Sequence, residues 1–307
     1  MHSHNHIVGR KLCISFWVTF VFILVELAAG VRAQSLALLS DAGHNFTDTL
    51  ALGLAWFAFY LQLKPPNEVK TFGYHRAGVL AAFVNAIILI LLAFYIFYES
   101  YLRFLAPREV REDIIITVAT AGLIVNLGVM WALHSHSSQD INIRGVFLHM
   151  FGDALSSIGL IVGGIFIANT HFQWIDPLLS MVIGALILWS AREIIRDSLN
   201  ILLEGLPSGI TREEVCRALT QITGVTDVHD LHIWSLSSRY HALSCHALID
   251  DLPHSSRDAI LGKINDLLER QFQIHHTTIQ FEHVRCEHAD DICARHDLEI
   301  SAAGRHS

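Results

Sequence analysis

Two apolar stretches of this sequence carry the same pair of metal-ligating residue types at the same spacing. His44 and Asp48 stand four residues apart in the first stretch, and His149 and Asp153 stand four apart in the second. A spacing of four places two side chains on one face of a helix, about one turn from each other. Two imidazoles and two carboxylates form a four-ligand set that suits tetrahedral Zn²⁺. The spacing therefore predicts a zinc site between two helices.

An ionisable side chain inside a membrane span costs roughly 2.5–3.5 kcal/mol on insertion scales, so such groups are functional candidates by default. The alternative is that each pair is a structural hydrogen bond between helices, but two pairs of the same order and spacing favour metal binding. Cobalt, nickel and cadmium would also fit, whereas magnesium and manganese prefer oxygen ligands. Such ligands lose protons when metal binds, which offers a route to metal/proton exchange. Glu26 is a further carboxylate in an apolar stretch, and the sequence names no partner for it.

The composition indicates a membrane protein that handles metal. Of 307 residues, 52% are hydrophobic and only 16% are charged, which is too apolar for an ordinary soluble domain. Twenty histidines are in excess of what a membrane protein needs, and histidine is a common zinc ligand. A net charge of −8 argues against a nucleic-acid partner, because a phosphate backbone requires a basic surface.

The elements that would position the ligands are membrane helices. A bilayer core of about 30 Å needs roughly 20 apolar residues per helix. Lys and Arg near the span ends favour the cytoplasmic side, and their distribution predicts that both termini are cytoplasmic. The chain offers six such spans, near residues 12–31, 36–61, 78–102, 113–133, 145–168 and 174–195.

After Pro207 the pattern becomes that of a soluble domain. Thr211 and Glu214 form a helix-capping signature, and the following segments alternate in the order helix, strand, strand, helix, strand. This order predicts a small α+β domain of the ferredoxin-like kind. The predicted organisation is a histidine-containing cytoplasmic tail, a six-helix transport domain, a cytoplasmic ferredoxin-like domain and a polar tail, over residues 1–11, 12–206, 207–286 and 287–307.

Four stretches carry a family resemblance: Ser35 through Asp48, Thr71–Arg76, Gly145–Gly164, and the Asp176-Pro177 pair that opens the sixth span. Over residues 12–283 the chain resembles the cation diffusion facilitator family, in particular its bacterial zinc-exporting branch. The resemblance implies a homodimer in the cell inner membrane that exchanges cytoplasmic Zn²⁺, and often some Cd²⁺, for protons by alternating access. It implies no organic cofactor.

The resemblance also implies a regulatory zinc site and an ion pair. The histidines at family positions of the soluble domain are His232, His246 and His283. An aspartate that other members have two residues after the third histidine is Arg285 here, and Cys286 and His254 are candidates to replace it in the ligand set. Arg76 and Glu204 occupy the positions of an interfacial ion pair, for which the alternative is two solvated charges.

Two other functions compete with transport. A membrane metalloenzyme would keep one coordination position of zinc open, whereas four protein ligands fill the shell, and the sequence has no HExxH motif. A metal sensor without transport would use the soluble-domain histidines and leave the intramembrane quartet without a purpose. We therefore predict a secondary transporter and not an enzyme.

Overall fold

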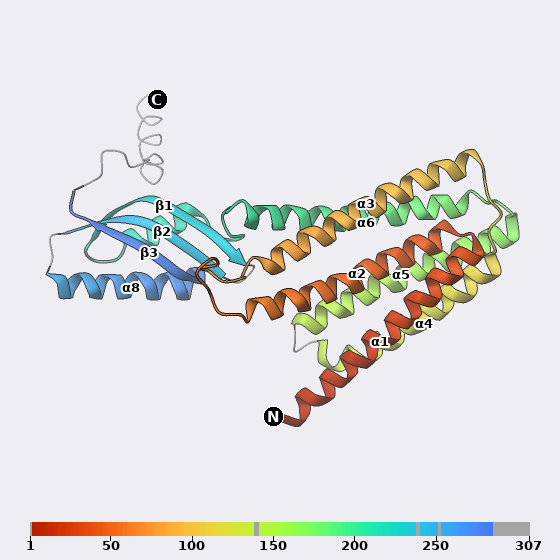
Figure 1. The fold of residues 1–307 in the computed structure, drawn as a ribbon, viewed down its shortest axis with the longest axis horizontal. Helices are drawn as coiled ribbons and strands as arrows, with labels where there is room; N and C mark the ends of the chain where they lie inside the picture. Colours follow the sequence, from red (N-terminus) through yellow and green to blue (C-terminus); the bar gives the residue numbers. More distant parts are fainter. Residues whose placement is uncertain (1, 138–140, 238–239, 251–252, 285–307) are drawn as a thin grey trace, which may run out of the picture. The chain divides into compact units, whose positions relative to one another are not determined.

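The computed structural model describes residues 2–137, 141–237, 240–250 and 253–284. Within these ranges it describes only the backbone of 2–15, 55, 132–137, 141–149 and 254–256. The first part of the chain folds into six long helices (Figure 1). They are α1 (His2–Ala33), α2 (Leu36–Gln62), α3 (Ala77–Leu105), α4 (Glu112–Ser137), α5 (Ile141–Thr170) and α6 (Ile175–Leu202).

The long helices coincide with the predicted spans, and most of them are apolar enough to cross a bilayer. Five of the described segments meet this condition by length and hydropathy: Phe16–Ala33, Ala77–Leu105, Glu112–Trp131, Met150–Thr170 and Ile175–Leu202. The remaining long helix is α2, whose polar residues lower its hydropathy. Helix α1 begins at His2, so the segment 1–11 that we predicted as a tail is continuous with the first helix.

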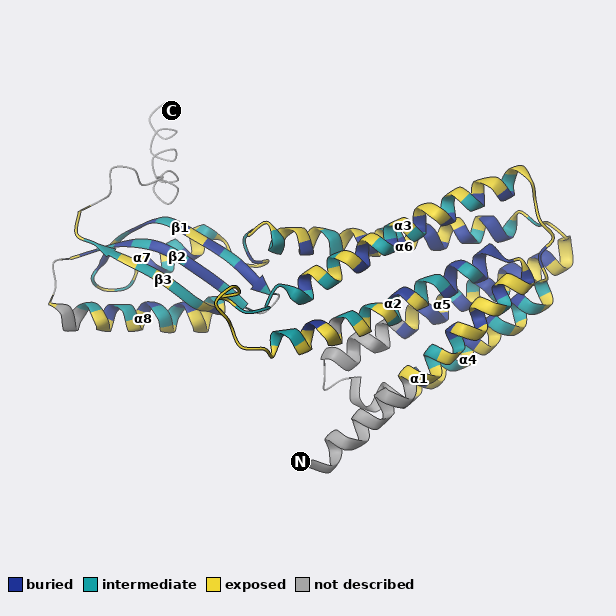
Figure 2. Cartoon of the chain, in the orientation of Figure 1, coloured by how far each residue is buried: buried dark blue, intermediate teal, exposed yellow. Residues whose placement is uncertain are grey.

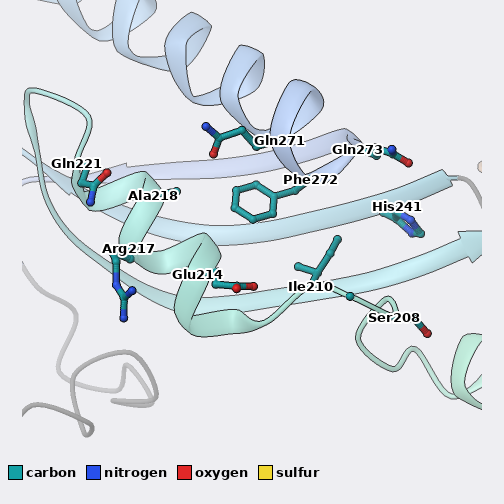
Figure 3. A pocket seen from close by; sticks show the side chains of 11 residues that line it. Ser208, Ile210, Glu214, Arg217, Ala218, Gln221, His241, Gln271, Phe272 and Gln273 are labelled. Atoms are coloured by element: carbon teal, nitrogen blue, oxygen red, sulfur yellow. The ribbon is translucent and has the colours of Figure 1, made fainter.

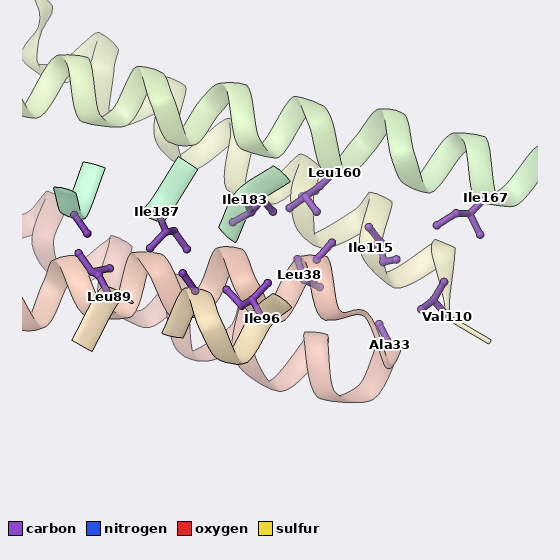
Figure 4. Packing of buried hydrophobic residues seen from close by; sticks show 14 residues of the cluster. Ala33, Leu38, Leu89, Ile96, Val110, Ile115, Leu160, Ile167, Ile183 and Ile187 are labelled. Carbon is purple, nitrogen blue, oxygen red and sulfur yellow. The ribbon is translucent and has the colours of Figure 1, made fainter. Parts of the chain in front are cut away.

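The helices share an apolar core to which all six contribute (Figure 4). Leu38 of α2, Ile96 of α3 and Ile187 of α6 are among its fully buried side chains. Large apolar side chains also lie on the outer surfaces of the helices, where Figure 2 shows bands of exposed residues. Trp131 is 84% exposed and Trp189 is 76% exposed. Water would disfavour so much exposed apolar surface, and a lipid environment would stabilise it.

The soluble domain has the predicted order of elements. It comprises α7 (Arg212–Thr220), β1 (Val225–Ser237), β2 (Tyr240–Ile249), α8 (His254–Phe272) and β3 (Ile274–Glu282). The sheet order is β1-β2-β3, with β1 and β2 antiparallel and β2 and β3 parallel. The predicted capping box at the start of α7 is confirmed, because Thr211 accepts from the Glu214 amide and the Glu214 side chain accepts from the Thr211 amide.

The core of this domain lies between the sheet and its two helices. Val215 and Leu219 of α7 and Ile264 of α8 pack against strand residues such as Val228 and Leu243, all of them buried. The described chain forms two compact units, and the soluble domain belongs to the second. The end of α2, the start of α3 and the end of α6 are part of the same unit, which comprises residues 55–83 and 196–307.

Candidate metal centres

The first predicted pair of ligands lies in the first half of α2. His44 Nε2 is 3.5 Å from Asp48 Oδ2, one turn further along the helix. The side chains are 27% and 25% exposed, so both are partly buried. The sequence produces this contact locally, since residues four apart are neighbours on a helix surface.

Helix α5 carries the second pair and contacts α2. The Ser156 hydroxyl of α5 donates a hydrogen bond to Asp41 of α2, and the two helices run antiparallel (Figure 1). This contact lies three residues before His44 on α2 and three residues after Asp153 on α5. Asp153 is buried, at 7% exposure. His149 lies on α5, but its side chain is outside the described residues.

Buried polar side chains surround this region. Asn45 Nδ2 donates to Glu26 Oε2 at 3.3 Å, which supplies the partner that the sequence did not name. Glu26 is 1% exposed and Asp41 is 3% exposed. The sequence prediction did not include Asp41 and Asn45 in the site. Asp41 stands three residues before His44, and this spacing, which places both on the same helix face, could have identified Asp41 as a neighbour of the site.

A buried carboxylate on α6 fixes the beginning of α2. Asp176 accepts from the Ser35 hydroxyl at 2.5 Å and from the Leu36 amide at 2.8 Å. Arg103 Nη1 of α3 lies 3.3 Å from the same carboxylate, and its Nε lies 3.3 Å from Glu99. An anion at a helix N-terminus satisfies amides that have no partner within the helix and interacts favourably with the helix dipole. Asp176 is thus a positioning residue for the helix that carries His44 and Asp48.

The soluble domain contains a second cluster of metal-ligating groups, one from each strand. His229 of β1 lies directly opposite His246 of β2, and Glu282 is at the end of β3. Glu282 Oε2 is 3.1 Å from His229 Nε2, and Glu282 Oε1 is 2.9 Å from His246 Nδ1. One ligand atom from each of the three lies within 4.8 Å of the other two. Ligand atoms about 2.1 Å from a tetrahedral zinc stand about 3.4 Å apart, so the three groups lie near the spacing that the ion requires.

This cluster shares only His246 with the predicted set. His232 is 60% exposed and lies 2.9 Å from Asp230 instead, and His283 is exposed beyond the end of β3. The physical reason is an irregularity in β1, where the pairing register shifts between His229 and His232 and Asp230 has a φ of +50°. Such a bulge changes which face successive side chains occupy. Cys286 and the side chain of His254 lie outside the described residues.

Arg76 and Glu204 approach as the sequence predicted. Arg76 Nη2 donates to Glu204 Oε1 at 3.0 Å, from the loop before α3 to the segment after α6. The side chains are 34% and 64% exposed. Because water screens exposed charges, a contact of this kind contributes little to stability.

A separate hollow on the soluble domain, about 580 Å³ in volume, lies beside α7 (Figure 3). Glu214, Arg217, His241 and Phe272 line it, and the three metal-ligating residues do not. Burial lowers the pKa of His241 below its usual value, and the nearby imidazole of His275 adds a smaller effect in the same direction. The Ser235 hydroxyl lies 3.1 Å from His241 Nδ1.

Two family models match the sequence. The one described as "Cation efflux transmembrane domain" matches residues 12–203. The one named ZT_dimer and described as "Cation efflux protein, cytoplasmic domain" matches residues 207–284. Together they span nearly all of the residues that the structure describes.

Several curated proteins are similar over nearly their whole length. A cadmium, cobalt and zinc/H(+)-K(+) antiporter of Bacillus subtilis is 40% identical, with 97% of each chain covered. The metal cation efflux system protein CzcD of Cupriavidus metallidurans is 39% identical, over 94% of this chain and 92% of that protein. The zinc transporter ZitB of Escherichia coli is 38% identical, over 94% and 95%. A solved structure of the metal-bound C-terminal domain of the CzcD transporter is 34% identical over 24% of this chain and 99% of that one, with a TM-score of 0.22.

Proposed function

The chain belongs to the cation efflux family of multi-pass membrane transporters, and from this premise we propose that it exports cytoplasmic Zn²⁺ in exchange for protons. The proposed transport site consists of His44, Asp48, His149 and Asp153. Cadmium and cobalt are further candidate substrates, because the names of two relatives include these metals or a general metal cation. The membrane proposed is the bacterial inner membrane, with both termini in the cytoplasm.

One observation carries the proposal more than any other. The hydrogen bond between Asp41 and Ser156 joins α2 and α5 three residues from His44 on one helix and three residues from Asp153 on the other, which supports a site shared by the two HxxxD pairs. His44 and Asp48 are already in contact and partly accessible, and Asp153 is buried on the neighbouring helix. Two carboxylates also offset the charge of a divalent ion in a region of low dielectric.

Exchange for protons follows from the chemistry of the ligands. An imidazole nitrogen binds either a proton or Zn²⁺, so metal entry displaces protons and metal release allows the ligands to recover them. Alternating access would expose the same four side chains first to the cytoplasm and then to the opposite side. Asp176 and Arg103 would keep the start of α2 fixed on α6 and α3 throughout this exchange.

We also propose that the soluble domain binds Zn²⁺ as a regulatory ligand through His229, His246 and Glu282. Two imidazoles and a carboxylate provide the donor atoms that zinc prefers, and a fourth position would remain for water or another side chain. The match to the ZT_dimer model supports a homodimer formed through this domain. Zinc that links the three strands could thereby report the cytoplasmic metal level to the dimer.

Zinc flux into proteoliposomes tests the transport site. The purified protein is reconstituted, a proton gradient is imposed, and zinc entry is followed with an enclosed fluorescent indicator. We expect Asp48→Ala and Asp153→Ala to abolish flux, and Asp113→Ala to leave it unchanged, because Asp113 is exposed at the start of α4. Flux in Asp48→Ala or Asp153→Ala equal to that of the Asp113→Ala control would reject the site.

A further inference from the structure

A large cavity lies within the second compact unit, and neither metal cluster is part of it. Its volume is about 990 Å³. It is bounded by the loop between α2 and α3, by the end of α6 and by residues of β1 and β2. The cavity therefore adjoins the point where α3, an apolar helix of membrane-spanning length, begins at Ala77.

The lining of this cavity is cationic. Lys70, Arg76 and Arg212 line it, and Glu204 is the single carboxylate among the lining residues. Glu204 pairs with Arg76 at 3.0 Å, which leaves an excess of positive charge. The Nε atoms of Arg76 and Arg212 are buried and have no hydrogen-bond partner in the described part of the chain. Because these Nε atoms are not open to the cavity, the terminal guanidinium nitrogens would contact a ligand, and guanidinium groups match the oxygens of a phosphate.

The rest of the lining is largely apolar. Leu80 at the start of α3, Leu202 at the end of α6 and Trp234 of β1 contribute to it. Val69 and Phe72 of the loop also line it, although their side chains are 82% and 43% exposed. An inorganic phosphate ion would gain nothing from these apolar side chains. A phospholipid would place its phosphate against the arginines and the upper part of its acyl chains against the apolar lining.

We propose that this cavity binds the phosphate headgroup of an anionic phospholipid, taken from the leaflet on the side of the soluble domain. Basic pockets beside membrane helices are a recurring kind of site for such headgroups. The bound lipid would bridge the loop before α3 and the soluble domain, both of which line the cavity. This binding is independent of the proposed zinc transport.

Lipid titration of the purified full-length protein in a neutral detergent tests the proposal. Native mass spectrometry counts bound phosphatidylglycerol for the wild type, for Arg212→Gln, and for Arg270→Gln, a control of equal charge change on the exposed end of α8. We expect Arg212→Gln to raise the dissociation constant of phosphatidylglycerol at least about tenfold, equivalent to about 1.4 kcal/mol, while the control remains like the wild type. Lys70→Gln, in an exposed loop, should weaken binding in the same direction relative to Lys263→Gln.

Three results would overturn the proposal. The first is equal affinity for phosphatidylglycerol in Arg212→Gln and Arg270→Gln, and in Lys70→Gln and Lys263→Gln. The second is equally tight binding of phosphatidylcholine, since a net neutral headgroup would not need the cations. The third is displacement of phosphatidylglycerol by millimolar inorganic phosphate, which would assign the site to a free ion. Asp48→Ala should bind the lipid like the wild type whatever its zinc flux.

Discussion

Replacing Glu282 by glutamine should remove zinc binding from the soluble domain while leaving the domain folded. Glu282 contacts both histidines of the cluster, with one carboxylate oxygen at 3.1 Å from His229 and the other at 2.9 Å from His246. The amide of glutamine is neutral and a poor zinc ligand. Without metal, the change weakens charge-assisted contacts to His229, which is 1% exposed, and should cost about 1 to 3 kcal/mol.

The wild type and Glu282→Gln should differ more in how far zinc stabilises them than in their stability without zinc. A ligand present at 100 times its dissociation constant stabilises the folded state by about 2.7 kcal/mol. Loss of an outer-shell partner of a metal ligand lowers affinity by as much as about 100-fold, and loss of a ligand itself should do no less. At the same zinc concentration the stabilisation would then fall to about 0.4 kcal/mol.

Thermal unfolding of the purified protein with and without zinc measures this difference. The variants are made in an Asp48→Ala background, so that the intramembrane site does not contribute. Glu269→Gln, on the exposed surface of α8, is the matched control. His229→Gln and His232→Gln are compared in the same assay, because the geometry assigns the first to the cluster and the second to its exposed surroundings. A full zinc shift in Glu282→Gln, or a larger loss in His232→Gln than in His229→Gln, would refute the assignment.

Three further predictions concern the scaffold around these sites. Asp176→Asn should destabilise the helical unit by about 3 kcal/mol, because the buried Arg103 loses a carboxylate, and zinc flux should fall relative to the exposed control Asp197→Asn. Thermal unfolding and liposome flux measure the two effects, and flux equal in both variants would contradict a positioning role. Thr211→Val should lower the stability of the soluble domain by about 1 kcal/mol through loss of the α7 cap, measured by denaturant unfolding, whereas an unchanged midpoint would show that the cap is dispensable. Because the pKa of His241 is lowered in the folded state, the unfolded chain gains a proton first as pH falls through about 6.5, so stability declines until the pH passes the folded pKa. His241→Gln should reduce the loss of stability between pH 7.5 and 5.5, and a pH profile like that of the wild type would exclude this explanation.

The sequence predicted the helices well because each apolar run is long enough to cross a bilayer. It predicted their ends less well, since hydropathy marks the apolar part of a helix and not its hydrogen-bonded limits. Helix α1 therefore begins at His2 rather than near residue 12. The order of elements in the soluble domain was also predictable, because capping residues and alternation act locally. The predicted fold class, a helical membrane protein with a C-terminal α+β domain, is confirmed.

The sites were predictable only as far as local spacing determines them. The four-residue spacing predicted the contact of His44 with Asp48, whereas the bond from Ser156 to Asp41 depends on how two distant helices pack. In the soluble domain, the irregularity at Asp230 interrupts the alternation of side chains between the two faces of β1. The sequence pattern therefore could not show that His229, and not His232, is the buried histidine. Glu282 of β3 pairs with Leu248 of β2, two residues beyond His246, so its contact with His246 depends on how the two strands pair.

The central claim is that zinc and protons exchange through the intramembrane quartet. Proteoliposomes that contain both a zinc indicator and a pH indicator test it most directly, because they record the two ions in the same vesicles. The proposal predicts that zinc entering the wild-type vesicles is accompanied by protons leaving them, and that Asp153→Ala abolishes both movements together. Zinc entry without proton movement, or both movements unchanged in Asp153→Ala, would contradict it.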